Sequence, residues 1–301
     1  MRTARKRRSV SGRLGVVVRN VVPLRARPDS SSEQVTQALI GQPVVAEAGR
    51  RDWLFVQTWD TYRGWIHESA VRFVDDPSRP YASAGAVAII RELFADILEA
   101  PSERARIITK ANISAEIEVA RADGDWAELR LPDGRAGFVR RHEARLVDRD
   151  LAQTIWLPEP AKLVETAMRF IGVPYLWGGT SPFGIDCSGF VQLVYRVHGV
   201  TLLRDAGIQA GDPRGERVSR SELRAGDLVF FTKAGDPRID PDTAGVTHVG
   251  MMIDGAEFTH SAGSTGVTVT ALEDPDYSDR LWGARRMRIE TLDPGGGAPQ
   301  D

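Results

Sequence analysis

The segment Asp186-Cys187-Ser188-Gly189-Phe190 is the centre of the chain, because Cys187 is the only cysteine in 301 residues. A lone cysteine is most often a small buried hydrophobe. Here a turn-forming aromatic run at 174–179 precedes it, apolar residues at helical spacing follow over 190–197, and Gly199 ends the pattern. This predicts a Gly-rich loop that delivers Cys187 to the first turn of a buried helix, with Asp186 as the N-cap.

A helix start is an environment that favours a thiolate, since unpaired N–H groups and the helix dipole both attract negative charge. We therefore expect the pKa of Cys187 to lie below the usual value of about 8.5, at roughly 3.5–7.5. The charge of Asp186 opposes this shift. On this reading Cys187 is a candidate nucleophile.

The composition is that of an ordinary globular protein, with 42% hydrophobic and 27% charged residues. A net charge of −2 gives no electrostatic case for nucleic acid. No apolar run approaches the roughly 20 residues that a membrane span needs. Residues 1–14 are a predicted disordered basic tail, and the apolar run at 14–18 is shorter than the about 7–15 residues of a signal peptide core. We expect a cytoplasmic protein, and a single cysteine fits a reducing compartment.

Two segments in the first half share a spacing of aromatic residues. Trp53 and Trp65 are twelve residues apart, as are Trp126 and Phe138, and the copies are offset by 73. The repeat predicts two tandem small all-β barrels, each with an aromatic plug and a Gly at a sharp strand bend. The pattern resembles the bacterial SH3-like (SH3b) domain. The predicted boundaries are 15–75 and 86–147.

The second half changes from helical to strand-like patterns. Residues 148–160 are a predicted linker, because prolines close it. Helical periodicity at 161–170 is followed by several strand-like runs, which predicts an α+β domain with an antiparallel sheet over 161–290. The expected strands are 227–231, 248–253, 256–260, 267–269 and 285–289. The Asp-, Gly- and Pro-rich stretch 232–246 is expected to be a long loop, typical of a lid, and 291–301 a disordered tail.

Two of the five histidines complete a chemical set with the cysteine. His248 opens one predicted strand and His260 lies late in the next, which suits neighbouring antiparallel strands. With Cys187 they favour a Cys–His–His nucleophilic site. The same three residue types can hold a catalytic zinc, but the helix-start cysteine favours a nucleophile, so we predict no metal and no cofactor. We interpret the other three, His67, His142 and His198, as surface or turn residues.

Five motifs resemble the NlpC/P60 family of papain-like cysteine peptidases. They are Pro174-Tyr175-Leu176-Trp177-Gly178-Gly179, Asp186-Cys187-Ser188-Gly189-Phe190-Val191, Gly226-Asp227-Leu228-Val229-Phe230-Phe231, His248-Val249-Gly250 and Phe258-Thr259-His260-Ser261-Ala262. The family cleaves peptide stems of bacterial cell walls, typically between D-glutamate and a diamino acid. The resemblance implies Cys187 as nucleophile, His248 as general base and His260 as the residue that orients His248.

A subset of this family carries SH3b domains in front and acts on free muropeptides with an unblocked N-terminal L-Ala. Leu203-Arg204-Asp205-Ala206 resembles its motif, in which an Asp binds the substrate ammonium with help from two tyrosines. The matching positions are Asp205, Tyr175 and Tyr62, although the first repeat offers no clear acidic partner for Tyr62. Further candidate substrate-binding residues are Asp186, Ser188, Trp177 and Arg204.

The resemblance therefore implies a γ-D-glutamyl-L-diamino acid endopeptidase of peptidoglycan recycling, whose partners are peptidoglycan-derived peptides. A buried carboxylate that faces an ammonium would reject an acylated N-terminus, because the carboxylate would remain desolvated and unpaired. Two alternatives stay open: a non-catalytic cell-wall-binding protein, and a papain-like amidase or hydrolase of intact peptidoglycan. The sequence leaves the oligomeric state and the accepted diamino acid open.

Overall fold

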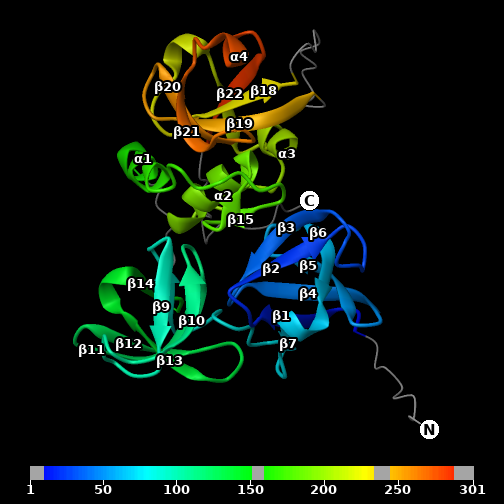
Figure 1. The fold of residues 1–301 in the computed structure, drawn as a ribbon, viewed down its shortest axis with the longest axis vertical. Coiled ribbons are helices and arrows are strands. Elements are labelled where there is room, and N and C mark those ends of the chain that lie inside the picture. Colours follow the sequence, from blue (N-terminus) through cyan, green and yellow to red (C-terminus); the bar gives the residue numbers. More distant parts are fainter. Residues whose placement is uncertain (1–9, 151–158, 234–244, 288–301) are drawn as a thin grey trace, which may run out of the picture.

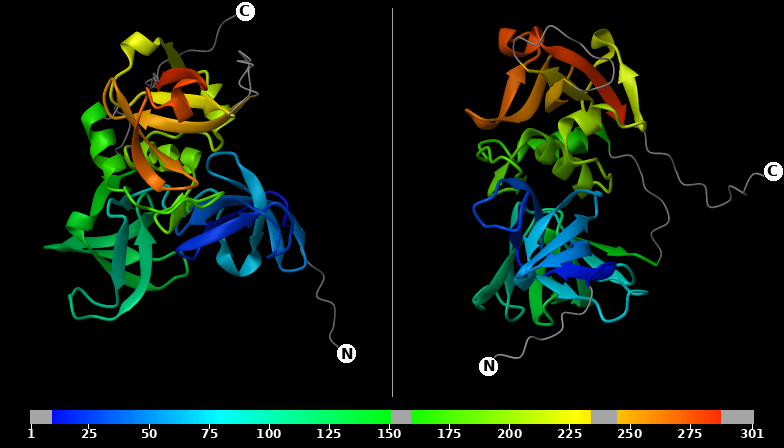
Figure 2. Two further views of the ribbon diagram at one scale, coloured as in Figure 1. Left: turned by 45° about the horizontal axis from the view of Figure 1, so that its top comes forward. Right: turned by 90° about the vertical axis from the view of Figure 1, so that its right-hand side faces the viewer.

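The structure is a computed structural model that describes residues 10–150, 159–233 and 245–287 (Figures 1 and 2). Several predictions fall wholly or partly outside these ranges: the basic tail, the 148–160 linker, the 232–246 loop, the end of the last strand and the tail 291–301. The described chain forms two seven-stranded sheets, a two-stranded hairpin and a six-stranded sheet. Its longest helix has 11 residues, and no described helix is long and apolar enough to cross a membrane.

The first sheet is antiparallel, with the order β3-β2-β6-β5-β4-β1-β7. Its strands are β1 Arg13–Val17, β2 Val21–Arg25, β3 Gln34–Leu39, β4 Pro43–Arg50, β5 Trp53–Thr58, β6 Arg63–His67 and β7 Val71–Phe73, with a 3-10 turn η1 at Glu68–Ala70. Apolar residues at every second position form its aliphatic core, as Leu54 and Val56 of β5 do.

The second sheet repeats this strand order as β10-β9-β13-β12-β11-β8-β14. Its strands are β8 Ala86–Ile90, β9 Phe94–Leu98, β10 Ile107–Asn112, β11 Glu116–Asp123, β12 Trp126–Arg130, β13 Ala136–Arg140 and β14 Ala144–Asp148, with a 3-10 turn η2 at Arg141–Glu143. The repeated spacing in the sequence thus corresponds to a repeated strand topology.

The expected aromatic plug is wrong. The aromatic residues that mark the repeat lie on the face opposite the aliphatic core, where Trp65 pairs across the hairpin with Phe55 at a ring distance of 5.2 Å. The shared spacing of the two copies reflects an equal hairpin register: Phe55 lies opposite Trp65 in the first copy, and Glu128 lies opposite Phe138 in the second. The Gly before each second aromatic avoids a clash: a Cβ on Gly137 would lie 2.5 Å from Ile97.

The remaining residues form an α+β arrangement. The helices are α1 Pro160–Met168, α2 Cys187–Val197, α3 Ala206–Ala210 and α4 Pro275–Ser278, with a 3-10 turn η3 at Arg220–Glu222. The strands are β15 Thr180–Ser181, β16 Gly184–Ile185, β17 Gly215–Val218, β18 Leu228–Thr232, β19 Val246–Met252, β20 Glu257–Ala262, β21 Gly266–Ala271 and β22 Leu281–Met287. The large sheet has the order β17-β22-β18-β19-β20-β21 and is antiparallel throughout.

Helix α2 packs on one face of this sheet. Phe190 and Val194 of the helix share a buried cluster with Phe230 and Val249 of the strands. The other face is covered in part by α4, whose Tyr277 packs against a second apolar cluster. The prediction of helices followed by an antiparallel sheet agrees with this part of the chain, but it missed β17, whose charged sequence has no apolar alternation.

Helices α1, α2 and α3 lie between the six-stranded sheet and the two seven-stranded sheets (Figures 1 and 2). Arg196 near the end of α2 touches both of the latter. Its guanidinium lies 3.6 Å from the ring centre of Trp59 in the first and 3.3 Å from the Glu116 carboxylate in the second. Because Arg196 is largely buried, this contact joins all three parts at one point.

Candidate active site

Cys187 is the first residue of α2, as the sequence predicts. The Asp186 side chain caps the helix by accepting a 2.7 Å hydrogen bond from the Gly189 N–H. The preceding loop folds back against this turn, and a Cβ on Gly189 would lie only 2.2 Å from the Gly179 carbonyl oxygen. The glycines of the motif are therefore required because backbone meets backbone here.

The expected low pKa of Cys187 is wrong for the substrate-free site. The residue is only 8% exposed, and burial, reinforced by the Asp186 carboxylate, raises the pKa of its thiol to about 12. The N–H groups of Val249 and Ser188 and the charge of Arg204 act in the opposite direction and are outweighed. Burial dominates because a lone charge is costly to desolvate, and the N-cap is itself an anion.

The two predicted histidines meet across adjacent strands. His248 on β19 and His260 on β20 are joined by a 2.8 Å contact between Nε2 of His248 and Nδ1 of His260, and the rings lie edge to face. Phe231, Phe258 and Tyr277 pack around them. Burial is the main cause that lowers the pKa of His248 to about 3 and that of His260 to about 4.

The cysteine lies against the strand that carries His248. The Val249 N–H, one residue after His248, interacts with the Cys187 thiol, and α2 packs on β19. The structure thus brings His248 and His260 into contact and packs the helix that begins at Cys187 on the strand that carries His248. Within the described ranges, no group of three or more His, Cys, Asp and Glu residues is arranged to hold a metal ion.

Three of the predicted substrate-binding residues form a buried network. The Arg204 guanidinium, 1% exposed, donates to both Asp186 carboxylate oxygens at 2.6 and 3.0 Å and to the Ser188 hydroxyl at 2.9 Å. Its Nε donates to the Thr36 hydroxyl of the first sheet at 2.9 Å. Arg204, Asp186 and Ser188 are thus paired with one another beneath the helix start, where they fix its geometry.

The other candidates gather at the boundary with the first sheet. The Tyr62 hydroxyl faces the Asp205 carboxylate. Burial, and after it the charge of Asp205 and the interaction between the two side chains, raises the pKa of Tyr62 to about 12. Burial raises the pKa of Asp205, while the Arg204 charge and the Tyr62 hydroxyl oppose the rise. Burial raises the pKa of Tyr175 to about 12, and a charge on the nearby Cys187 sulfur adds to this rise. The acidic partner of Tyr62 therefore comes from another part of the chain.

Trp177 is held against the first sheet as well. The residue is 61% exposed, but its indole N–H donates to the Glu33 carboxylate at 2.8 Å and its carbonyl accepts from the Gln34 amide at 2.9 Å. Farther along, the Thr180 N–H donates to the Gln37 side chain at 2.9 Å. The loop that precedes the cysteine is thus clamped onto strand β3.

Sequence reasoning missed the β3 residues of this clamp, and it missed Thr36. They are polar residues on a short strand, and nothing in their spacing separates them from residues that face solvent. Their partners lie more than 140 positions away in the chain, so only the folded structure brings them together.

Comparison with known proteins agrees with this geometry. Residues 172–286 match the NlpC/P60 family, and residues 24–71 match the bacterial dipeptidyl-peptidase Sh3 domain. Dipeptidyl-peptidase 6 of Lysinibacillus sphaericus is 30% identical over 267 residues, which cover 86% of this chain and 92% of that protein. The chain belongs to the NlpC/P60 family.

Other NlpC/P60 relatives extend the similarity beyond the peptidase region. Gamma-D-glutamyl-L-lysine dipeptidyl-peptidase of Bacillus cereus (strain ATCC 10987 / NRS 248) is 29% identical over 264 residues, covering 83% of this chain and 74% of that protein. The crystal structure of an NlpC/P60 family protein from Bacillus cereus ATCC 10987 has a TM-score of 0.80 at 24% identity, covering 91% and 99% of the two chains. This likeness shows a shared fold over almost the whole molecule.

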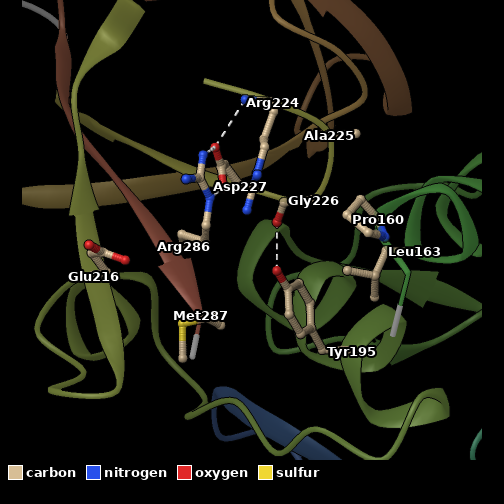
Figure 3. Close-up of a pocket in the computed structure, with 10 residues that line it drawn as sticks. All are labelled: Pro160, Leu163, Tyr195, Glu216, Arg224, Ala225, Gly226, Asp227, Arg286 and Met287. Atoms are coloured by element: carbon tan, nitrogen blue, oxygen red, sulfur yellow. Dashed lines mark hydrogen bonds and ion pairs between the residues drawn. The ribbon is translucent and has the colours of Figure 1, made fainter. Parts of the chain in front are cut away.

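A separate hollow of about 360 Å³ lies at the far end of the NlpC/P60 domain core (Figure 3). The Tyr195 hydroxyl donates to the Gly226 carbonyl there at 2.5 Å, and Arg286 pairs with the Asp227 carboxylate at 2.8 Å. Tyr195 is about 12 Å along α2 from Cys187, at 1.5 Å per residue. Because none of the three candidate catalytic residues lines this hollow, we do not assign the peptidase chemistry to it.

Proposed function

We propose that this chain is a cysteine endopeptidase that hydrolyses the γ-D-glutamyl–L-diamino acid bond of muropeptides with a free N-terminal L-Ala. Two observations carry the proposal. Cys187 meets the backbone of the strand that bears His248, which contacts His260, and Asp205 faces Tyr62 across the domain boundary. The names of the full-length relatives, dipeptidyl-peptidase 6 and gamma-D-glutamyl-L-lysine dipeptidyl-peptidase, support it.

In the proposed reaction His248 acts first as a general base. Burial favours a neutral thiol and a neutral imidazole at rest, so the proton moves from Cys187 to His248 as the sulfur attacks the γ-carbonyl carbon. The Cys187 N–H is at the first turn of α2, where N–H groups have no helical partner. It is a donor for the oxyanion of the tetrahedral intermediate.

The second half of the reaction returns the enzyme to its starting state. The imidazolium of His248 gives its proton to the amine of the diamino acid as the C–N bond breaks, which leaves a thioester on Cys187. His248 then takes a proton from water as the hydroxide adds to the thioester carbonyl. The sulfur departs and is reprotonated, which releases the L-Ala-γ-D-Glu dipeptide.

Asp205 and Tyr62 form the proposed ammonium site. The carboxylate is half-buried and interacts with the charge of Arg204 and with the Tyr62 hydroxyl. The Arg204 guanidinium gives its hydrogen bonds to Asp186, Ser188 and Thr36, so an incoming ammonium can pair directly with a carboxylate whose charge burial has made costly. An acylated N-terminus carries no charge and has one N–H donor where the ammonium has three. It would leave the carboxylate desolvated without a directly paired cation, which is a physical basis for rejecting it.

We further propose that both seven-stranded sheets are SH3-like domains, at 15–75 and 86–147, and that 161–290 forms a papain-like domain after the linker 148–160. The identical strand order of the two sheets supports the second SH3-like assignment. An enzyme restricted to free N-termini acts on released peptides rather than on intact wall, which fits a role in peptidoglycan recycling. The cytoplasmic location stays a prediction.

The test compares L-Ala-γ-D-Glu-diaminopimelate with its N-acetylated form. We expect cleavage of the free peptide alone, and none with Cys187→Ala. Asp205→Asn should lower kcat/KM for the free peptide roughly 10- to 150-fold, because a hydrogen bond to a charged group contributes about 1.5–3 kcal/mol. Tyr62→Phe, which removes one hydroxyl, should lower kcat/KM less than Asp205→Asn does.

The outcomes separate the alternatives. Cleavage of both peptides at similar rates would contradict the proposed selection for a free N-terminal ammonium and favour a less selective amidase or wall hydrolase. Cleavage of neither peptide would favour the non-catalytic binding protein.

A further inference from the structure

Two isoleucines at equivalent positions of the repeat are buried outside their own sheets. Ile40 directly follows β3 of the first sheet, and Ile113, 73 positions later, directly follows β10 of the second. Ile40 is buried in the apolar cluster of the second sheet. Ile113 is buried in the cluster of the NlpC/P60 domain that contains Phe190 and Val194 of α2. Each seven-stranded sheet thus contributes an isoleucine to the core of the part that follows it in the chain.

The same backbone turn presents both isoleucines. The next residue has a left-handed conformation in each copy, with φ of +84° at Gly41 and +69° at Ser114. The N–H groups of these residues donate to the carbonyls of Val17 and Ile90, at 2.9 and 2.8 Å. A Cβ on Gly41 would lie 2.0 Å from the Glu116 carbonyl oxygen, so the first turn lies directly against the backbone of the second sheet.

The turn at Ile40 is continuous with the strand that holds the loop in front of the cysteine. On β3, the Thr36 hydroxyl accepts from Arg204 at 2.9 Å, and the Gln37 side chain accepts from the Thr180 N–H at 2.9 Å. Ile40 is three residues beyond Gln37. Because its side chain is enclosed by the second sheet, that sheet fixes the end of β3.

The second sheet also contacts the NlpC/P60 domain directly. The ring of Phe94 on β9 lies 4.9 Å from that of Phe183, which is in the turn of the hairpin between β15 and β16. Arg169 donates to the Arg91 carbonyl at 2.8 Å. The hairpin that leads into Asp186 is therefore in contact with the second sheet through Phe183, while β15 is in contact with the first.

We infer that the second seven-stranded sheet is a structural support for the active site. It takes up Ile40 and inserts Ile113, and so holds β3 against the segment that precedes Cys187. Parts of a chain that share a buried apolar contact do not move independently. This role differs from that of a separate wall-binding module, whose apolar residues would be buried within the module itself. Ile40 and Ile113 are on this view positioning residues, remote from the chemistry.

The test uses hydrogen exchange of the full chain, read by mass spectrometry. Ile40→Ala and Ile113→Ala each remove a buried side chain and leave a cavity at a boundary. Ile40→Val and Ile113→Val remove one methyl group and serve as milder variants that retain the fold. Ile107→Ala is the matched control, because Ile107 is an isoleucine of the second sheet that is 48% exposed.

The decisive segment is 176–181, which contains the Thr180 amide bonded to Gln37. A bonded amide exchanges only when its hydrogen bond opens. Both alanine variants should make this segment exchange roughly 10- to 100-fold faster, although neither residue belongs to it. The valine variants should show a smaller change of the same sign. Strand β5, within the first sheet, should keep its wild-type rate, as should every segment of Ile107→Ala.

The same variants should affect the proposed reaction. We expect kcat/KM on the free peptide to fall roughly tenfold or more in both alanine variants, because small displacements of catalytic groups are costly. This readout rests on the proposed function, whereas the exchange readout does not. Absence of cleavage by the wild-type protein would therefore count only against the proposed function.

Two results would overturn the inference. One is a folded alanine variant in which segment 176–181 exchanges at the wild-type rate, since the second sheet would then not hold β3 in place. The other is an equal acceleration in 176–181 and in β5, which would indicate a general loss of stability. If an alanine variant does not fold, the comparison of the same two segments is made in its valine counterpart.

Discussion

Arg204 gives the sharpest test of how the helix start is held. Arg204→Met removes a guanidinium that is 1% exposed and makes four hydrogen bonds, two of them to Asp186. Loss of one partner of a buried ion pair typically costs about 3–5 kcal/mol, because the other charge stays buried and uncompensated. Asp186 keeps hydrogen bonds from the Gly189 N–H and the Ser188 hydroxyl, so we expect the lower end, about 3 kcal/mol.

The assay is urea unfolding followed by tryptophan fluorescence. The matched control is Arg106→Met, because Arg106 makes a bidentate pair with Glu99 in which both side chains are more than half exposed. Such a surface pair contributes about 1 kcal/mol or less. Pairing Arg204→Met with Asp186→Asn should recover part of the loss, because Asn still caps the helix but carries no stranded charge.

Arg204→Met should also lower kcat, since the charge of Arg204 helps to lower the pKa of Cys187 and its loss makes the thiol harder to deprotonate. The reasoning fails if Arg204→Met costs no more than Arg106→Met. It also fails if Asp186→Asn brings no recovery, because the stranded carboxylate would then not be the cause of the loss.

Three further outcomes are expected. Gly178→Ala should destabilise the protein more than Gly172→Ala. Both glycines have positive φ, which costs a residue with a Cβ about 1–2 kcal/mol, but only at Gly178 would the Cβ also meet a β3 carbonyl oxygen, at 2.7 Å. Equal losses of unfolding free energy in urea would contradict this prediction. The free energy of unfolding should fall as pH drops from about 6.5 toward 4, because His248 and His260 have lowered pKa values in the folded state and the unfolded chain binds more protons in that window; a slope that is unchanged in His260→Gln would argue against it. Iodoacetamide should label Cys187 more slowly than free cysteine at pH 7.5, since the raised pKa of Cys187 keeps its thiol protonated. Faster labelling would instead support a thiolate in the substrate-free site.

Local patterns in the sequence carried much of the fold. Asp186 and the apolar spacing after it place the start of α2, because capping and helical periodicity depend on neighbours within one or two turns. The equal spacing from Trp53 to Trp65 and from Trp126 to Phe138 indicates the repeated strand order, because the two residues of each pair lie on the two strands of one hairpin, which are close in sequence.

The same reasoning failed where the outcome depends on distant contacts. It placed the aromatics inside the barrels, although spacing fixes which residues face each other and not which face is buried. It also predicted a low pKa for Cys187, because the helix start is visible in the sequence and the depth of burial is not. Charged β17 was missed for a related reason, as its pairing with β22 is made by main-chain bonds.

The sequence by itself determined the chemistry: one cysteine at a helix start, two histidines on successive strands and a carboxylate at Asp205. Each is recognisable from its immediate neighbours. Only the tertiary structure decided how these groups are held and charged. Arg204 meets Thr36, Tyr62 meets Asp205 and His260 meets Thr270 through contacts between separate elements, and the burial that sets the proton positions is a property of the packed molecule as a whole.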